Sequence, residues 1–235
     1  MNHKQIYENR WSEYLKSPLP NGAIQSLPNE TLESLSTILM NGRRVLDLGC
    51  GTGNSGEVLK KFFPEIYGCD ISCNALGEAL INGIEVLCVN LNAGELPFKD
   101  RSIDTVISLE VIEHLLDPVY LLKESYRILH SEGQLILTTP NIRYFRNLNK
   151  LFFKGRFPHT TTDNFIWGGG HLHYFTRKDL YLMLSRVGFR EIKFHINKQQ
   201  FRRSRKRRFL RTLTGDTMFG DFFCGGIIAE AFKKR

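Results

Sequence analysis

The segment 45–53 constrains the fold more than any other part of this chain, and it reads VLDLGCGTG. Its first half is a short apolar, β-prone run, which is typical of a buried strand in a parallel sheet. Glycines then occupy every second position, at Gly49, Gly51 and Gly53, where the missing Cβ lets the backbone turn sharply and approach a ligand closely. A helix is expected directly after them, and the unpaired N–H groups at its start could face a polar or anionic group of that ligand.

A second signal is an acid at the end of the next expected strand, 66–70. Asp70 lies about 20 residues beyond the first glycine, near the spacing at which an acid meets the ribose of a nucleotide. Strand, glycine turn and acid together predict a site for an adenosine-containing cofactor. Gly51, Gly53 and Gly56 also satisfy the Gly-x-Gly-x-x-Gly spacing of dinucleotide sites, so NAD and an oxidoreductase activity stay open as an alternative.

Helix-like and strand-like runs alternate along the chain. Strands are expected at 43–48, 66–70, 84–89, 103–109, 133–139, 189–195 and 226–232, and helices at 31–40, 54–63, 72–82, 118–129 and 177–187. This alternation predicts an α/β fold with a doubly wound, mostly parallel, Rossmann-like sheet in a single domain. Residues 1–42 are expected to form a helical lead-in to the domain at 43–235.

Five sequence pieces in a fixed order carry a family resemblance. They are DLGCGTG at 47–53, Asp70, LPF at 96–98, SIDTVI at 102–107 and EVIEH at 110–114. In order and spacing they resemble class I S-adenosylmethionine-dependent methyltransferases over about residues 43–194. The chain is most similar to the small-molecule branch that includes the ubiquinone-pathway O-methyltransferases and the MetW-like proteins. The resemblance implies seven strands, of which the last is antiparallel, and S-adenosylmethionine as the cofactor.

The resemblance also assigns cofactor-binding residues. The positions that would shape the methionine pocket are Asp47, Gly49, Gly51 and Gly53, and Asp70 would hold the ribose. The turn that reaches the adenine in the family is Asn90, Leu91 and Asn92 here, where the family usually has an Asp. Glu110 ends the strand 103–109 and would line the cofactor edge, because ligands of such sheets bind at the carboxyl ends of the strands.

Three histidines are candidates for a catalytic base. Methyl transfer from a sulfonium is an in-line displacement, so alignment supplies much of the rate, and an oxygen nucleophile also gains from losing its proton. A histidine can accept that proton, and His114 is the first candidate by position, followed by His171 and His173. The alternative is structural: His114 would bond to backbone at a helix start, and the other two would order the loop before Thr176.

The acids beside His114 suggest a metal site as an alternative. Glu110, Glu113 and His114 match, residue by residue, a cluster that binds a divalent metal in the ubiquinone-pathway branch. Such a set could hold Mg²⁺ or Zn²⁺ and lower the pKa of an acceptor hydroxyl. The same EVIEHL sequence occurs in relatives with no assigned metal, so no metal is predicted and this set is kept as the alternative.

The excess positive charge of the chain is local. The formal net charge is +8, and the stretch 198–211 holds eight Lys or Arg and no acid. This stretch begins a basic insertion at 198–224. It has three interpretations: a solvated loop, a nucleic-acid contact, or a contact with an anionic membrane surface, for which Phe and Leu interleave with the cations at 198–213. A separate long connection, 141–172, is expected at the active edge and would carry acceptor specificity.

The rest of the composition favours a cytoplasmic protein, with a peripheral position at a membrane as the alternative. No apolar run approaches the ~20 residues of a membrane span, and the first residues do not resemble a signal peptide. The five cysteines are expected to be buried, reduced thiols.

These observations predict an S-adenosylmethionine-dependent methyltransferase that acts on oxygen of a small molecule, a sugar or a lipid-linked precursor. One alternative is an RNA methyltransferase that uses the basic stretch. Another is a non-catalytic, partner-binding protein that keeps the fold. The sequence predicts neither the acceptor nor the oligomeric state.

Overall fold

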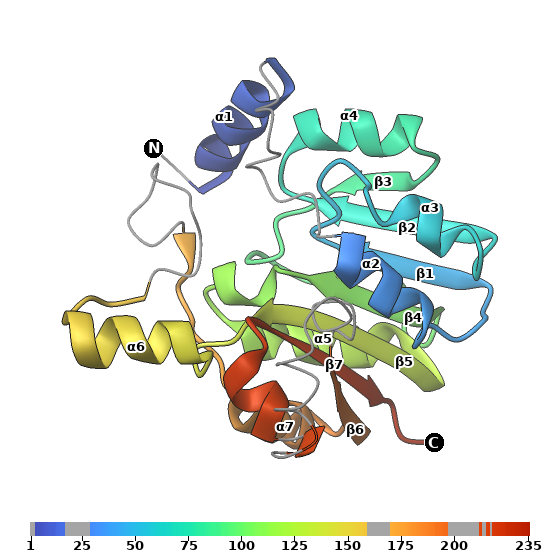
Figure 1. The fold of residues 1–235 in the computed structure, drawn as a ribbon. Helices are drawn as coiled ribbons and strands as arrows, with labels where there is room; N and C mark the ends of the chain where they lie inside the picture. The colour runs from blue at the N-terminus through green and yellow to red at the C-terminus, as the bar shows by residue number, and fades with distance from the viewer. Residues whose placement is uncertain (1–2, 17–28, 159–169, 197–211, 213–214, 217) are drawn as a thin grey trace.

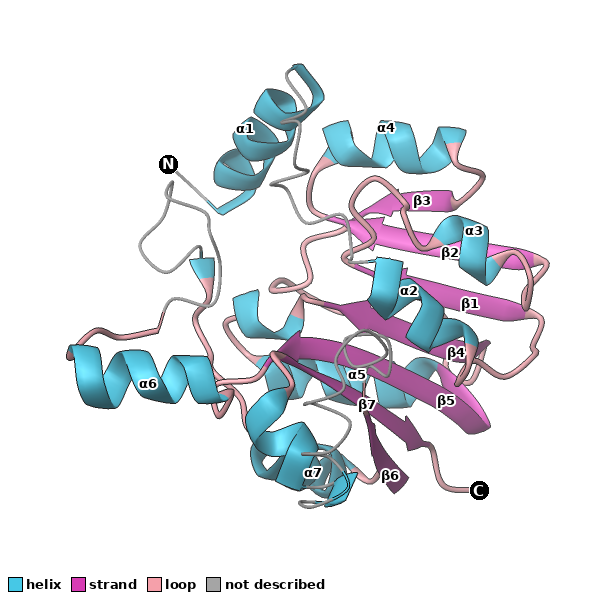
Figure 2. Cartoon of the chain, viewed as in Figure 1, coloured by secondary structure: helices cyan, strands magenta, loops and turns pink. Residues whose placement is uncertain are grey.

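A seven-stranded sheet forms the centre of the protein (Figure 1, Figure 2). The computed structural model describes residues 3–16, 29–158, 170–196, 212, 215–216 and 218–235. The strands are β1 (Arg44–Leu48), β2 (Glu65–Asp70), β3 (Glu85–Cys88), β4 (Ile103–Leu109), β5 (Leu129–Pro140), β6 (Arg190–His195) and β7 (Gly226–Phe232). Their order is β3-β2-β1-β4-β5-β7-β6. β7 pairs antiparallel with both β5 and β6, and the other neighbouring pairs are parallel. The predicted Rossmann-like fold, with an antiparallel last strand, is confirmed.

Helices follow the strands in the expected alternation. They are α1 (His3–Lys16), α2 (Asn29–Ser36), α3 (Gly56–Leu59), α4 (Cys73–Ile81), the 3-10 helix η1 (Ile112–His114), α5 (Pro118–Ile128), α6 (Phe145–Lys154) and α7 (Arg177–Val187). Side-chain caps define the starts of α4, α5 and α7, through Ser72, Asp117 and Thr176. These starts agree with the sequence because capping depends on residues close together in the chain.

Two helices are shorter than predicted. The helix expected at 54–63 is the four-residue α3, and turns occupy the remaining positions. Ser55 precedes α3, but its hydroxyl donates to the Asp47 carboxylate instead of capping the helix. The helix expected at 31–40 ends at Ser36, although Leu39 beyond its end is still buried.

Apolar side chains pack on both faces of the sheet, because successive residues of a strand point to opposite sides. On β1, Leu46 and Leu48 join the core that includes residues of α5 and α7, whereas Val45 joins the core that includes residues of α2 and α3. Helices therefore cover both faces, and the carboxyl edge of the parallel strands is left for a site.

The prediction of five buried, reduced thiols is wrong for two cysteines. Cys73, at the start of α4, and Cys88, at the end of β3, are exposed and form a disulfide. Cys50, Cys69 and Cys224 are buried and free. The apolar run around Cys88 suggested burial, but β3 is an edge strand with a neighbour on one side only.

Some predictions fall on segments that the structure describes only in part. The basic stretch 198–211 lies outside the described residues, and so does the suggested membrane contact at 198–213 except for residue 212. Within the insertion 198–224, residues 218–223 are helical. The connection 141–172 contains α6. No helix in the described part of the chain has the length and apolar character needed to cross a bilayer.

Candidate functional site

A pocket lies at the carboxyl ends of β1, β2 and β4, and residues of α1 line part of its wall. Eight of the nine predicted cofactor-binding residues line it: Asp47, Gly49, Gly51, Asp70, Asn90, Leu91, Asn92 and Glu110. Gly53 lies outside the lining. Of the three candidate histidines, all of which are described, His114 lines the pocket, whereas His171 and His173 do not.

The turn after β1 needs its glycines for different reasons. Gly49, Gly51 and Gly53 have φ values of 74°, 51° and 77°, which residues with a Cβ rarely adopt. A Cβ on Gly49 would collide with Val111, and one on Gly51 would lie 2.9 Å from a ring carbon of Trp11. A Cβ on Gly53 would instead lie 2.9 Å from the backbone of α4. The first two glycines therefore keep the pocket wall bare, and the third lets the turn pack on α4.

Asp70 joins the two turns that border the pocket. Its Oδ2 accepts the N–H of Gly51 at 3.0 Å, and its Oδ1 accepts the N–H of Ser72 at 2.9 Å. Burial raises the pKa of this carboxyl, although the amide hydrogen bonds oppose the rise. Each carboxylate oxygen has a further lone pair, so Asp70 can accept ligand hydroxyls while it keeps these bonds.

A second buried acid, Asp47, lies in β1 and is 2% exposed. It accepts the hydroxyl of Ser55. Burial raises the pKa of Asp47 to about 7, and the Ser55 hydrogen bond opposes this rise. A cation in the pocket would stabilise the ionised form of such a desolvated carboxyl. Asp47 therefore favours a positively charged ligand.

The loop after β3 is held by its own amide side chains. Asn90 Oδ1 accepts the N–H of Asn92 at 3.0 Å, and Asn92 Oδ1 accepts the N–H of Leu116 at 2.7 Å. These bonds tie the loop to the segment after η1. What the loop can offer a ligand is therefore the amide nitrogens, the remaining lone pairs and the apolar surface of Leu91.

Two acids follow β4 at the same edge. Glu110 has a φ of 57°, and its N–H donates to the carbonyl of Thr138 at 3.1 Å. A left-handed backbone at a non-glycine residue costs energy and is often found at functional sites. Burial raises the pKa of Glu110 to about 7. Burial and the charge of Glu110 raise the pKa of Glu113 well above its usual range.

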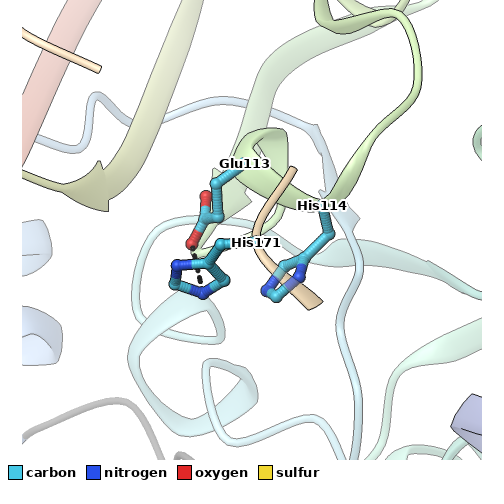
Figure 3. A group of neighbouring side chains, drawn as sticks. All are labelled: Glu113, His114 and His171. Carbon is cyan, nitrogen blue, oxygen red and sulfur yellow. Dashed lines mark ion pairs between the residues drawn. The ribbon is translucent and has the colours of Figure 1, made fainter. Parts of the chain in front are cut away.

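Glu113, His114 and His171 form a cluster beside the pocket (Figure 3). Glu113 Oε1 lies 3.8 Å from His171 Nε2, and the two imidazole rings meet edge to face with centroids 4.5 Å apart. His114 Nδ1 lies 3.0 Å from the carbonyl oxygen of Gly170. Because a carbonyl only accepts, Nδ1 is the protonated nitrogen, and in the neutral ring Nε2 carries the lone pair. His114 thus lines the pocket, as predicted for a catalytic base, and also bonds to a backbone carbonyl, as the structural alternative predicted.

The alternative metal set is brought together only in part. Ligand atoms of Glu113, His114 and His171 lie within 4.8 Å of one another, so His171 takes the place that the sequence gave to Glu110. A carboxylate with two imidazoles suits Zn²⁺ or a similar transition-metal ion. His173 is outside this cluster, and its ring stacks on Phe175 with centroids 5.8 Å apart.

Helix α1 supplies pocket residues that the sequence analysis did not assign. Tyr7 and Trp11 line the pocket, and the Tyr7 ring lies 6.2 Å from that of His114. Between them in the sequence, Glu8 accepts the hydroxyl of Ser72 and the first N–H of α4, both at 2.9 Å. The helical spacing of the two aromatic residues predicts that they share one face of a helix. It does not indicate whether that face packs on the cofactor or on the hydrophobic core.

Comparison with known proteins shows what this pocket belongs to. A model of the methyltransferase domain family matches residues 21–193. The chain belongs to the class I S-adenosylmethionine-dependent methyltransferases. This methyltransferase is 32% identical over 99 residues to a probable S-adenosylmethionine-dependent methyltransferase of Mycobacterium tuberculosis, which is 42% of this chain and 36% of that protein. It is 30% identical over 142 residues to a ubiquinone biosynthesis O-methyltransferase of Xanthomonas euvesicatoria pv. vesicatoria, which is 57% of each chain.

The matches thus span between 36% and 57% of the length of these relatives. Solved structures share the fold across the whole methyltransferase. An S-adenosylmethionine-dependent methyltransferase of Thermotoga maritima, described as a possible histamine N-methyltransferase, superposes with a TM-score of 0.67 at 21% identity, over 99% of this chain and 100% of that one. Phosphoethanolamine N-methyltransferase 2 of Haemonchus contortus, in complex with S-adenosyl-L-methionine, superposes with a TM-score of 0.70 at 17% identity, over 100% of this chain and 61% of that one.

S-adenosylmethionine is the cofactor of this methyltransferase. The pocket residues fit it on chemical grounds. The cofactor carries a ribose, an ammonium and a sulfonium, and the pocket offers the bare backbone of the Gly49–Gly51 turn and the two buried acids Asp47 and Asp70.

Proposed function

We propose that this methyltransferase is an active enzyme that methylates an oxygen atom of a small molecule, a sugar or a lipid-linked precursor. His114 carries the proposal, because its ring lines the pocket while the carbonyl of Gly170 holds its orientation. The distant likeness to proteins named ubiquinone biosynthesis O-methyltransferase supports oxygen as the acceptor atom. The bound cofactor supplies an activated methyl group. This chain therefore has to bind the acceptor, align its hydroxyl with that methyl group and remove the hydroxyl proton.

We assign cofactor binding to the wall formed by β1, β2 and the loop after β3. The backbone at Gly49 and Gly51 would accommodate the methionine part, with the Asp47 carboxylate as counter-charge to its cationic groups. Asp70 would hold the ribose, and the loop at Asn90–Asn92 would lie against the adenine. Glu110 would border the same edge.

In this proposal His114 would accept the proton of the acceptor hydroxyl as the new O–C bond forms and the bond between the methyl carbon and the sulfonium sulfur breaks. The accepting atom is Nε2, because Nδ1 donates to Gly170. Glu113 and His171 lie beside this ring and act as positioning residues. We assign no step to His173.

A second candidate uses the same cluster to hold a divalent metal, which would lower the pKa of the acceptor hydroxyl. The observation that favours it is Glu113 Oε1, which is buried and has no hydrogen-bond partner in the described part of the chain. Transfer activity that survives dialysis against EDTA excludes this candidate. Loss of activity that Mg²⁺ or Zn²⁺ restores would replace the histidine base with the metal.

Calorimetry with S-adenosylmethionine and S-adenosylhomocysteine tests cofactor binding. We expect both to bind, and Asp70→Ala to weaken both by about tenfold or more, because it removes the ribose acceptor and the anchor of Gly51. If neither compound binds, the proposal fails.

Labelled cofactor incubated with fractionated cell extract then identifies the acceptor through the labelled product. We expect His114→Gln to keep cofactor affinity and to lower the transfer rate by roughly 10²–10⁴-fold. An unchanged rate would remove His114 from the mechanism. Intact cofactor binding without transfer to any fraction would favour the non-catalytic alternative.

A further inference from the structure

Helix α6 presents large apolar side chains to solvent. Phe152 is 74% exposed and Phe153 is 84% exposed. Leu151 and Phe157, on either side of this pair, are 45% and 51% exposed. In Figure 1, α6 projects from the body of the protein instead of lying across the sheet. An exposed apolar cluster of this kind marks a contact site for a partner or a membrane.

Cations accompany the aromatic residues on the same helix. Arg146, Lys150 and Lys154 recur every four residues, so they form one row along the helix. Arg156 follows the helix after the C-cap Gly155, and the sequence contains no Asp or Glu from 142 to 162. Lys150, Lys154 and Arg156 are exposed and make no ion pair with any residue that the structure describes. The helix therefore combines apolar surface with uncompensated positive charge.

We propose that α6 docks the protein on the surface of an anionic lipid bilayer. Phe152 and Phe153 enter the boundary between headgroups and acyl chains, and Lys150 and Lys154 lie against the lipid phosphates. A helix that exposes aromatic side chains together with cations binds membranes by this combination of burial and charge.

The charge distribution favours a lipid surface over other occupants. A second copy of the chain would bring two rows of unpaired cations together at the interface, which is unfavourable. Single-stranded nucleic acid binds in grooves where bases stack on aromatic rings, whereas α6 is a projecting helix. A bilayer offers both an apolar layer for the phenylalanines and a continuous anionic surface for the lysines.

The same helix is connected to the catalytic pocket. β5 ends at the carboxyl edge of the sheet, and α6 begins five residues after Pro140, with Phe145. After the helix, the Phe157 ring packs on that of Tyr174 with centroids 4.9 Å apart, and Tyr174 lies 6.4 Å from His171. Docking through α6 would therefore hold the pocket edge close to the membrane. The docking proposal does not rest on the proposed acceptor, because α6 would bind the membrane in the same way if the acceptor were soluble.

Co-sedimentation of the full-length protein with vesicles tests the docking. We expect partition onto vesicles of phosphatidylcholine with phosphatidylglycerol, and little onto phosphatidylcholine alone. Phe152→Ser with Phe153→Ser should lower partition by about tenfold or more. Lys150→Glu with Lys154→Glu should lower it by about 25-fold or more, since each of the two cations near the surface contributes about fivefold. Raising the salt concentration should weaken vesicle binding of the wild-type protein more than vesicle binding of the lysine variant.

A matched control is the pair Leu80→Ser and Ile81→Ser, which are 60% and 78% exposed on α4. We expect this control to partition like the wild-type protein, and all variants to bind S-adenosylmethionine equally, which shows that they are folded. Absence of binding to anionic vesicles would overturn the proposal, and so would equal partition of the α6 variants and the wild-type protein. Two further outcomes would overturn it, each in a Phe152/Phe153 variant that still binds vesicles. One is loss of binding to a short RNA, and the other is loss of self-association in sedimentation velocity.

Discussion

At the scale of single residues, the pocket depends on carboxyl groups that are buried before any ligand is bound. Asp47 and Asp70 both have a raised pKa because burial disfavours their charged form. Their hydrogen bonds, to Ser55 and to the amides of Gly51 and Ser72, hold them in place but do not supply a positive charge. The protein thus carries an electrostatic cost in the free state that a cationic cofactor relieves.

This cost leads to a prediction for Asp47→Asn. The pKa of Asp47 is about 7 in the folded protein, well above the value of 3.8 for an exposed aspartate, so its contribution to stability is fully present below about pH 4 and is lost as pH rises to 7. Asparagine keeps the acceptor for Ser55 without the charge. Between pH 5 and pH 8, the variant should gain about 2.6 kcal/mol in free energy of unfolding relative to the wild-type protein, measured by urea denaturation.

The same variant should bind S-adenosylmethionine more weakly at pH 8, because the counter-charge is gone. Asp117→Asn serves as the control, since Asp117 is an exposed cap of α5 outside the pocket lining. A pH-independent difference between Asp47→Asn and the wild-type protein would show that Asp47 is not a buried ionisable group in solution.

At the scale of elements, α1 is held over the pocket by a capping interaction. Glu8 accepts the hydroxyl of Ser72 and the N–H of Cys73, so an acid of one helix satisfies donors at the start of another, α4. Tyr7 and Trp11 on the same helix line the pocket. Glu8 therefore helps to fix the position of these aromatic residues, together with a hydrogen bond from the Asn74 amide to the Ser12 hydroxyl.

We expect Glu8→Ala to weaken S-adenosylmethionine binding by about tenfold, because α1 loses its anchor on α4. Calorimetry measures this loss. The control is Glu78→Ala, since Glu78 is exposed on α4 itself. Equal affinity of the Glu8 variant and the wild-type protein would mean that α1 does not contribute to the cofactor site.

At the scale of the whole molecule, cofactor binding should be visible as stabilisation. A ligand that binds only the folded state at about 100 times its Kd adds about 2.7 kcal/mol to the free energy of unfolding. For a chain of this size that corresponds to a rise in Tm of roughly 5–10 °C, measured by differential scanning fluorimetry.

The comparison ligand is NAD at the same concentration, since Gly51, Gly53 and Gly56 also satisfy the dinucleotide spacing. We expect NAD to leave the Tm unchanged. A larger shift with NAD than with S-adenosylmethionine would contradict the assignment of the pocket to the methyltransferase cofactor.

Much of the fold followed from local patterns. The carboxyl ends of the strands, the starts of α4, α5 and α7 and the glycine turn agree with the sequence because apolar periodicity, capping and positive φ depend on neighbouring residues. The predictions failed where distant contacts compete with local preference. Ser55 does not cap α3 because its hydroxyl bonds to Asp47, and Cys73 meets Cys88 because β3 is the edge strand beside β2.

The sequence by itself determined the order of the chemical groups along the chain: the bare turn after β1, the acid that ends β2 and the acids that follow β4. Only the tertiary structure decided which distant groups meet at the site. It placed Trp11 over Gly51 and His171 beside His114. It also placed Gly53 against the backbone of α4. The physical reason is that these encounters depend on how separate segments pack, and no pattern within a single segment records them.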